Sequence, residues 1–154
     1  TADDLILGVV LGGNIDPAVP LALQYATSPA VDASEVIATL KLSYWRVLNS
    51  DYAPYSNNTV EVWDGAAWQQ LMETGTDTPE DAVWTYFEHD LTAYANDSLQ
   101  VRFGYSVGDS LAVDAGSSWN LDDVRIQQSL EPYCCDWDSD CEGMQMTCFG
   151  TICQ

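Results

Sequence analysis

Apolar and polar residues alternate in short runs along most of this chain. In the run from Leu99 to Tyr105, every second side chain is apolar, and Gln100 and Arg102 lie between them. Successive side chains of a β-strand point to opposite faces, so this alternation is typical of a strand with one face in a core. Gly, Pro, Asn and Asp separate the runs, as turns require. The predicted strands cover residues 2–13, 21–25, 38–47, 58–63, 66–72, 83–90, 99–105 and 117–127.

One turn can be predicted from its sequence. Asp64 and Gly65 separate the runs VEVW and AAWQQLM. An Asp-Gly pair between two β-like runs is a strong signal for a hairpin, because both residues accept the backbone angles of a tight turn. We therefore expect residues 58–63 and 66–72 to form neighbouring antiparallel strands.

The last run, SSWNLDDVRIQ, changes phase at its two aspartates. Apolar residues before Asp122 share one parity, and those after Asp123 share the other. A regular strand cannot bury both sets on one face, so we expect an extra residue, a β-bulge, at Asp122-Asp123. A bulge with two carboxylates at the end of a strand is also a candidate cation site. The four apolar residues are Trp119, Leu121, Val124 and Ile126.

The succession of strands predicts an all-β fold. Repeated strands with turn signals at this spacing indicate a sandwich or a barrel. We predict a two-sheet antiparallel β-sandwich (jelly roll) in residues 1–130 and a small disulfide-rich C-terminal tail in residues 131–154. The 154 residues suffice for one such domain and a short appendage.

The charge of the chain is strongly unbalanced. It carries 24 acidic against 4 basic residues, a formal net charge of -20. Nucleic acid needs a basic face, and anionic membranes attract basic segments, so this charge argues against both partners. Excess acid is tolerated where bound Ca²⁺ or a salty medium neutralises it. A surface that merely favours solubility is the alternative interpretation.

All five cysteines lie between Cys134 and Cys153. Clustered cysteines without the surroundings of a metal site are typical of disulfides in an oxidising compartment, so we expect a secreted, extracellular protein. The sequence contains no apolar run of about 18 residues that could span a membrane. Thr1 is interpreted as the start of a processed product or of a cut-out fragment.

Five segments between Leu21 and Ile126 follow one another in a familiar order: TSPAVD, ATLKLSYWRV, NTVEVWDGAAWQQL, DLTAYANDSLQVRFGYS and WNLDDVRI. This order resembles the MAM-like jelly rolls of secreted bacterial proteins, which accompany metallopeptidases of the immune-inhibitor-A type. The resemblance implies a two-sheet antiparallel jelly roll that acts as a non-catalytic accessory domain. Such modules often have a longer first-strand region with a tryptophan, so a missing or rearranged first strand is expected here.

The implied architecture is also similar to many carbohydrate-binding modules, which commonly hold a structural Ca²⁺ beside the last strand. An aspartate of the closing motif is a usual ligand there, and Asp122 is the matching residue. The first and last segments of a jelly roll lie near each other, so both can supply the oxygen ligands that Ca²⁺ requires. Alternatively, Asp123 bonds the bulged backbone and Asp122 is solvated. The expected Ca²⁺ ligands are Asp122, Asp123, Asp3, Asp4, Asn14 and Asp16.

The tail resembles the short Cys-rich repeats that follow extracellular bacterial domains. Its cysteines are odd in number, so one must pair outside the segment or stay free. Its DWDSDCEG segment begins like a Ca²⁺ loop, but Cys141 stands where an EF-hand requires Gly. Other connectivities and a zinc site stay open. The preferred disulfides are Cys135–Cys148 and Cys141–Cys153, which leaves Cys134 to pair elsewhere.

Several of the aromatic residues are expected at the surface. Trp45 shares the parity of Lys41, and Trp63 shares that of Glu61, so both indoles should point outward. The apolar face of a sugar ring stacks on exposed aromatic rings, whereas most Trp and Tyr residues in such a fold only pack in the core or at its edges. The candidate ligand-binding residues are Trp45, Trp63, Tyr52 and Tyr55.

The sequence predicts no catalytic residue. His89 is the only histidine and lies in a predicted strand, and Glu61 and Glu88 are two of 24 acids, some of which will be neighbours by chance. We therefore predict a non-enzymatic adhesion or interaction module, stabilised by Ca²⁺, that binds another extracellular protein or self-assembles. The alternative is a carbohydrate-binding module that uses the outward aromatics to bind glycans.

Overall fold

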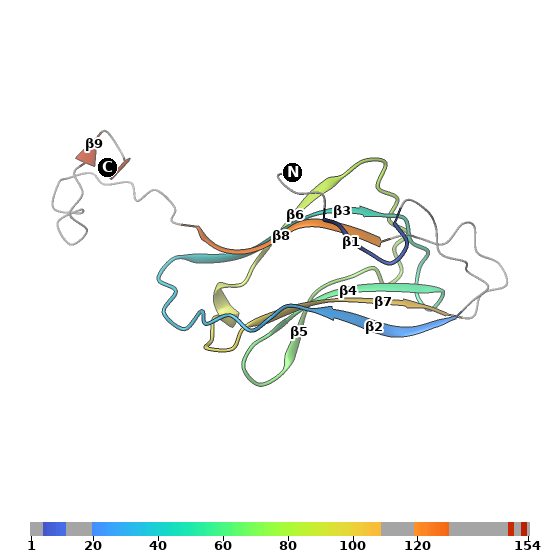
Figure 1. Cartoon of the computed structure of the whole chain (residues 1–154), viewed down its shortest axis with the longest axis horizontal. Helices are drawn as coiled ribbons and strands as arrows, with labels where there is room; N and C mark the ends of the chain where they lie inside the picture. The colour runs from blue at the N-terminus through green and yellow to red at the C-terminus, as the bar shows by residue number, and fades with distance from the viewer. Residues whose placement is uncertain (1–4, 12–19, 109–118, 130–147, 150–151, 154) are drawn as a thin grey trace.

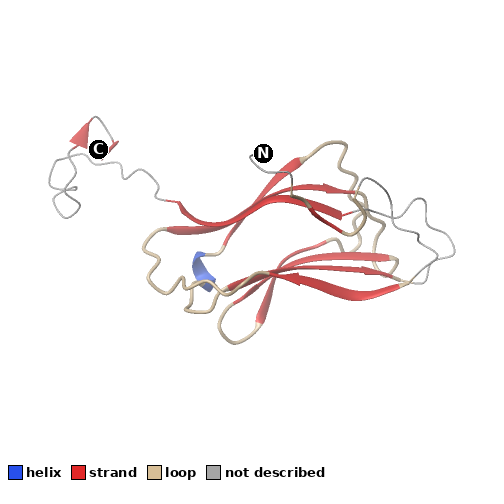
Figure 2. Cartoon of the chain, viewed as in Figure 1, coloured by secondary structure: helices blue, strands red, loops and turns tan. Residues whose placement is uncertain are grey.

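The structure is a computed structural model that describes residues 5–11, 20–108, 119–129, 148–149 and 152–153. Within these residues, eight strands form two layered sheets of four strands each (Figures 1 and 2). A turn of 3-10 helix, η1 (Thr92–Tyr94), connects two of the strands. The strands are β1 (Leu7–Gly8), β2 (Leu21–Thr27), β3 (Thr39–Leu48), β4 (Ser56–Trp63), β5 (Trp68–Glu73), β6 (Thr85–Asp90), β7 (Gln100–Val107) and β8 (Trp119–Ser129).

The two sheets have the connectivity of a jelly roll. Sheet A has the strand order β1-β8-β3-β6, and sheet B has the order β2-β7-β4-β5. All neighbouring strands in both sheets are antiparallel. This order of eight strands is that of two interleaved Greek keys. The predicted two-sheet antiparallel sandwich is therefore confirmed.

The hydrophobic core fills the space between the two sheets. Leu42 and Tyr44 of β3 are fully buried there, as are Val60 and Val62 of β4. The Phe103 ring of β7 meets the Tyr44 ring edge-on, with 5.3 Å between the ring centroids. Each fully buried aliphatic or aromatic side chain stabilises the fold by about 1.5–3 kcal/mol. The alternation in the sequence thus identified the inner faces of these strands.

The predicted bulge lies on β8. Ser43 of β3 pairs with Arg125, and Trp45, two residues further along β3, pairs with Asp122. One residue of β3 therefore faces two residues of β8, which is the definition of a bulge. Asp123 has a φ of 50°, a left-handed conformation that few residues other than glycine adopt.

The bulge explains most of the phase change. Trp119 and Leu121 are buried before it, and Ile126, which has the other parity, packs against the same core after it. Val124 is one of the two bulged residues, with Asp123, and is exposed. The bulge therefore turns three of the four apolar residues toward the core, and the fourth stays at the surface.

The first strand is much shorter than predicted. Instead of a strand over residues 2–13, only Leu7 and Gly8 pair, with Leu121 and Asn120 of β8. Asp122 still pairs with Trp45, and the bulge at Asp123 and Val124 follows, so a β1 extended toward its N-terminus would soon meet an irregular part of β8. The ends of the predicted strand, residues 2–4 and 12–13, lie outside the described residues. The exposed apolar side chains of this segment are Leu5, Ile6, Leu7, Val9 and Leu11.

In the tail, the structure describes one short hairpin. β9 (Cys148–Phe149) pairs with β10 (Ile152–Cys153), and the register places Cys148 opposite Cys153. Cys134, Cys135 and Cys141 lie outside the described residues, so the disulfide pairing and the domain boundary at residue 130 stay predictions. In the described parts of the chain, no helix has the length and apolar composition needed to cross a membrane.

Candidate functional site on the outer face of sheet B

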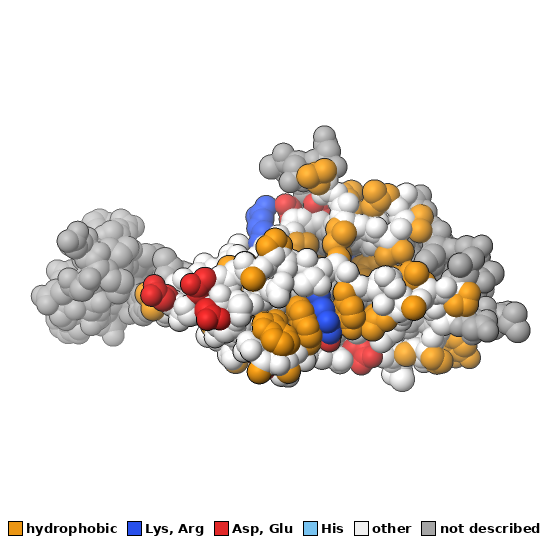
Figure 3. All heavy atoms as spheres, turned by 60° about the horizontal axis from the view of Figure 1, so that its bottom comes forward, with side chains coloured by type: hydrophobic (Ala, Val, Ile, Leu, Met, Phe, Trp, Pro, Cys, Tyr) orange, Lys and Arg blue, Asp and Glu red, His pale blue; other side chains and the backbone are white. Residues whose placement is uncertain are grey.

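The outer face of sheet B receives one key side chain from each of its four strands. Tyr25 lies on β2, Arg102 on β7, Glu61 on β4 and Trp68 on β5. Glu61 and Arg102 are direct partners in the β4–β7 ladder. The neighbours of Glu61 and Arg102 along their strands are buried in the core, so these two side chains must point outward, and the Tyr25 and Trp68 rings lie against Arg102 on the same face. In Figure 3, a basic side chain (blue) lies between hydrophobic side chains (orange).

Arg102 is the centre of this arrangement. Its Cζ atom lies 3.8 Å from the centroid of the Tyr25 ring and 4.0 Å from the centroid of a Trp68 ring. Its Nε and Nη2 atoms donate hydrogen bonds to the two carboxylate oxygens of Glu61, at 2.9 and 3.2 Å. The planar guanidinium is thus held between two aromatic rings and paired bidentately with a carboxylate. Each of the two rings is fixed in turn by the cation.

The hairpin between β4 and β5 adds a second indole. Trp63 pairs with Trp68 across the hairpin, and their ring centroids are 5.6 Å apart with 59° between the planes. Asp64 accepts hydrogen bonds from the backbone N–H groups of Ala66 and Ala67, both at 2.8 Å, and these bonds lower the pKa of its carboxyl. Gly65 has a φ of 96°, which glycine tolerates best. The predicted Asp-Gly turn therefore sets the distance between the two tryptophans.

A glycine makes room for the Tyr25 ring. Tyr25 pairs with Gly104 across β2 and β7. A Cβ atom at Gly104 would lie 2.7 Å from Cε1 of Tyr25 and would also collide with the hydroxyl of Thr59. Burial raises the pKa of the Tyr25 hydroxyl, and the Glu61 carboxylate nearby raises it further. The phenol therefore stays protonated and able to donate a hydrogen bond at neutral pH.

We call this set the aromatic platform. The cation and the carboxylate in it neutralise each other, so its central part is amphipathic and close to uncharged. Of its members, sequence reasoning identified only Trp63 as a binding residue. The outward parity of Arg102 was a visible signal, but which strands would lie side by side was not, and neither was its pairing with Glu61. The members are Tyr25, Glu61, Trp63, Trp68 and Arg102.

The predicted ligand-binding residues lie in three separate places. Trp63 belongs to the aromatic platform, but Trp45 points outward from sheet A, on the other side of the sandwich. Tyr52 and Tyr55 lie in the loop between β3 and β4, where their ring centroids are 5.1 Å apart and nearly perpendicular. These four residues therefore do not form one binding surface.

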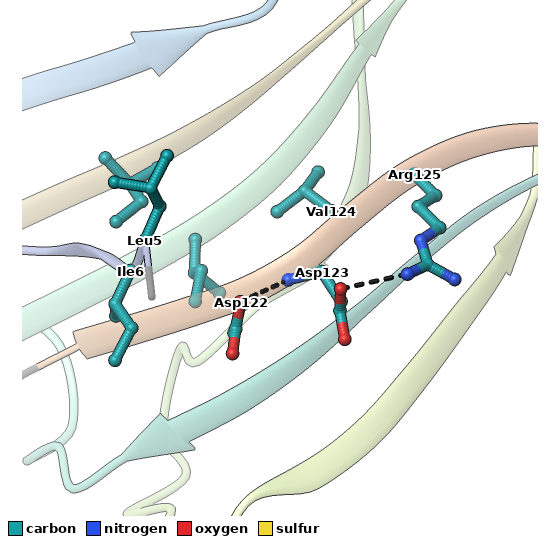
Figure 4. Close-up of a pocket in the computed structure, with 8 residues that line it drawn as sticks. Leu5, Ile6, Asp122, Asp123, Val124 and Arg125 are labelled. Atoms are coloured by element: carbon teal, nitrogen blue, oxygen red, sulfur yellow. Dashed lines mark hydrogen bonds and ion pairs between the residues drawn. The ribbon is translucent and has the colours of Figure 1, made fainter. Parts of the chain in front are cut away.

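The two aspartates of the bulge are engaged by neighbouring residues (Figure 4). Asp122 accepts a hydrogen bond from the backbone N–H of Asp123 at 2.8 Å, and Asp123 pairs with Arg125 at 2.9 Å. Within the described residues, no three His, Cys, Asp or Glu side chains are placed to hold a metal ion. Calcium stays a prediction, since several expected ligands lie outside the described residues. These are Asp3, Asp4, Asn14 and Asp16.

The side chains considered for catalysis lie apart from one another. Glu61 is on the outer face of sheet B, whereas Glu88 of β6 points outward from sheet A. These two carboxylates face opposite sides of the molecule and cannot act as an acid–base pair on one substrate. His89 points inward instead, and its Nε2 lies 3.0 Å from the hydroxyl of buried Tyr44.

Comparison with known proteins gives few matches. No family model matches the chain, and no curated protein matches it, so the resemblance to MAM-like modules stays a prediction. One similar solved structure is TmCBM61 in complex with β-1,4-galactotriose, with 14% identity over 70% of this chain and a TM-score of 0.39. A CBM4 structure has 11% identity over 70% of the chain and a TM-score of 0.35. The chain spans 61% of the length of each.

Proposed function

We propose that this chain is a glycan-binding module and that the aromatic platform is its binding surface. The observation that carries the proposal is the Arg102 guanidinium held between the Tyr25 and Trp68 rings. Aromatic rings bind best when they are already fixed, because no side-chain freedom is then lost on binding. The platform is fixed in this way before any ligand arrives.

The chemistry of the platform matches that of a sugar ring. A pyranose ring has an apolar face of C–H groups, which packs on an aromatic ring, and a rim of hydroxyl groups that need hydrogen-bond partners. Trp63, Trp68 and Tyr25 supply ring surface. The pair of Arg102 with Glu61 uses two of the five N–H donors of a guanidinium and leaves lone pairs on the carboxylate. Ligand sites commonly combine apolar rings with a few such polar groups.

The charges favour an uncharged glycan over an anionic one. Arg102 is neutralised by Glu61, and the chain as a whole carries a net charge of -20. A polyanion such as a uronate or sulfated polysaccharide would be repelled at long range. A neutral polysaccharide meets no such barrier.

Affinity electrophoresis through gels that contain neutral polysaccharides tests the proposal. The critical variant is Tyr25→Ala, and the matched control is Tyr52→Ala, because the two tyrosines are 40% and 41% exposed but lie on different parts of the molecule. We expect a neutral polysaccharide to retard the wild type, Tyr25→Ala to be retarded clearly less, and Tyr52→Ala to be retarded as much as the wild type. Equal behaviour of the two variants, or no retardation of the wild type by any neutral polysaccharide, contradicts the proposal.

The charge argument has its own test. Glu61→Gln leaves the guanidinium of Arg102 without its carboxylate and so creates a local positive charge on the platform. We expect this variant to gain binding to polygalacturonate at low salt, while the wild type shows none. If the wild type binds polygalacturonate as well as it binds neutral polysaccharides, the preference for uncharged glycans is wrong.

A protein partner or self-assembly is the second candidate function. The observation that favours it is the exposed apolar surface of the segment around β1, including Ile6, Leu7 and Leu11. Such surface is often covered by a partner. Light scattering coupled to size exclusion, with and without EDTA, tests self-assembly: a constant monomer mass over a wide concentration range contradicts it.

A further inference from the structure

The outer face of sheet A carries a second group of exposed aromatic residues. Trp45 of β3 and Tyr86 of β6 are direct partners in the ladder, and both are exposed. Their ring centroids are 5.5 Å apart and their planes meet at 62°. Two rings in this edge-to-face geometry leave ring surface open to a ligand. None of these contacts involves a residue of the aromatic platform.

Polar groups lie directly beside these two rings. The Tyr86 hydroxyl donates a hydrogen bond to Oε2 of Glu88 at 3.1 Å, and the Lys41 ammonium pairs with Oε1 of Glu88 at 2.9 Å. These bonds lower the pKa of Glu88, so its carboxylate is ionised at neutral pH. The group therefore combines open ring surface with a carboxylate and a neutralising cation. We call Trp45, Tyr86, Glu88 and Lys41 the Trp45 face.

The Trp45 face and the aromatic platform point in opposite directions. One lies on the outer side of sheet A and the other on the outer side of sheet B, with the core between them. Packed sheets are roughly 10 Å apart, so the two outer surfaces are separated by more than that distance. A glycan that lies along one face would have to bend around the sandwich to reach the other. Two separate chains can occupy the faces together.

We infer that the Trp45 face is a second site for uncharged glycans and that the module is bivalent, so that it bridges two polysaccharide chains. The inference rests on the glycan-binding function proposed for the aromatic platform. A sugar fits the Trp45 face better than a protein does, because its paired rings are bordered directly by the charged groups of Lys41 and Glu88. A stable protein interface needs about 800 Å² from each partner with an apolar centre.

The stoichiometry of binding tests this inference. The probe is a short oligosaccharide from the neutral polysaccharide that retards the wild type most, titrated by calorimetry into the whole chain. We expect two sites per chain in the wild type and one in Tyr86→Ala. Tyr25→Ala should also retain one site, and Tyr86→Ala combined with Tyr25→Ala should retain none. Tyr52→Ala should keep two sites.

Cross-linking gives a second readout. The wild type should raise the light scattering of a long neutral polysaccharide by joining chains, and each single variant should bind the polysaccharide without this rise. One site in the wild type, lost in Tyr25→Ala and unchanged in Tyr86→Ala, overturns bivalency but leaves the platform function intact. If Tyr86→Ala loses all binding and Tyr25→Ala loses none, both proposals are overturned. Trp45→Ala is a second variant of the Trp45 face. Thermal melts of each variant check that any loss of binding does not reflect unfolding.

Discussion

The two outer faces of the sandwich combine aromatic rings with an ion pair in different ways. On sheet B, the side chains of Arg102 and Glu61 are only 19% and 15% exposed, and the cation lies inside the ring stack. On sheet A, those of Lys41 and Glu88 are 24% and 38% exposed, and the pair lies beside the rings. A guanidinium can stack between rings while it binds a carboxylate bidentately, whereas an ammonium is a compact, strongly hydrated charge. The sheet B face is therefore the more rigid of the two.

A buried arginine, Arg46, is held in the same way as Arg102, by an aromatic ring and a carboxylate. Arg46 lies with its Cζ atom 3.9 Å from the centroid of the Phe87 ring and donates two hydrogen bonds to Asp81, at 2.8 and 3.0 Å. With Arg125 bound to Asp123, each of the four basic residues of the chain takes part in an ion pair. The few cations are thus all used locally, and the acid excess remains to repel polyanions.

The largest expected effect comes from removing the cation of the aromatic platform. Arg102→Ala leaves Glu61 unpaired under the remains of the ring stack and removes two cation–π contacts. We expect a loss of about 2–4 kcal/mol in the free energy of unfolding, measured by urea denaturation. Arg102→Lys should recover only part of this loss, because an ammonium replaces neither the stack nor the bidentate pair. Full recovery in Arg102→Lys would contradict the comparison of the two faces.

The next effect comes from filling the space beneath Tyr25. Gly104→Ala places a methyl group where the Tyr25 ring and the Thr59 hydroxyl now lie. We expect a loss of about 1–3 kcal/mol in the free energy of unfolding, as is typical of overpacking. Glycan retardation should fall with it, because the ring must move. The control is the double variant Gly104→Ala with Tyr25→Ala, in which only the part of the loss caused by the Tyr25 ring should return, because the Thr59 hydroxyl still meets the added methyl group.

A smaller effect concerns pH and the inner side of sheet A. Burial lowers the pKa of His89, so the folded state holds this ring neutral against Tyr44. As pH falls below the unfolded value of about 6.5, the unfolded chain takes up a proton before the folded chain does, and stability is lost. We expect the melting temperature to be lower at pH 5.5 than at pH 7.5, which lie about one unit either side of the unfolded pKa. The difference should be smaller in His89→Gln. Equal falls in both proteins would show that other groups cause the loss.

The smallest effect is expected on the outer side of sheet A. Lys41→Ala breaks an exposed ion pair, and such pairs contribute about 0–1 kcal/mol. Urea denaturation should show a loss within this range, well below that of Arg102→Ala. A loss as large as that of Arg102→Ala would show that the two faces are equally rigid, against the comparison drawn above.

Much of the fold could be predicted from local sequence, and the exceptions have clear causes. The Asp64-Gly65 turn was predicted, and a bulge was predicted within one residue of its place at Asp123 and Val124, because each depends on a few adjacent residues. The apolar pattern of residues 2–13 predicted too long a first strand, although the resemblance to MAM-like modules had indicated a missing or rearranged one. The pairing of β1 depends on β8, more than a hundred residues later. The sequence of residues 2–13 carries no sign of the bulge in that distant strand.

The candidate site was predictable only in part. Alternation placed Trp45 and Trp63 outward, but an outward side chain can belong to either sheet, and these two belong to opposite ones. Tyr25 and Arg102 were missed because their contact joins β2 to β7, which are distant in the sequence.

The sequence by itself determined most of the strands and, for β3, β4 and β7, which side faces the core. These properties follow from a two-residue period that the backbone geometry imposes locally. Only the tertiary structure decided which outward side chains meet. That depends on which strands pair and in what register, and pairing between distant segments is fixed by the packing of the whole core rather than by any local pattern. The stack around Arg102 exists because four separate strands bring its members to one place.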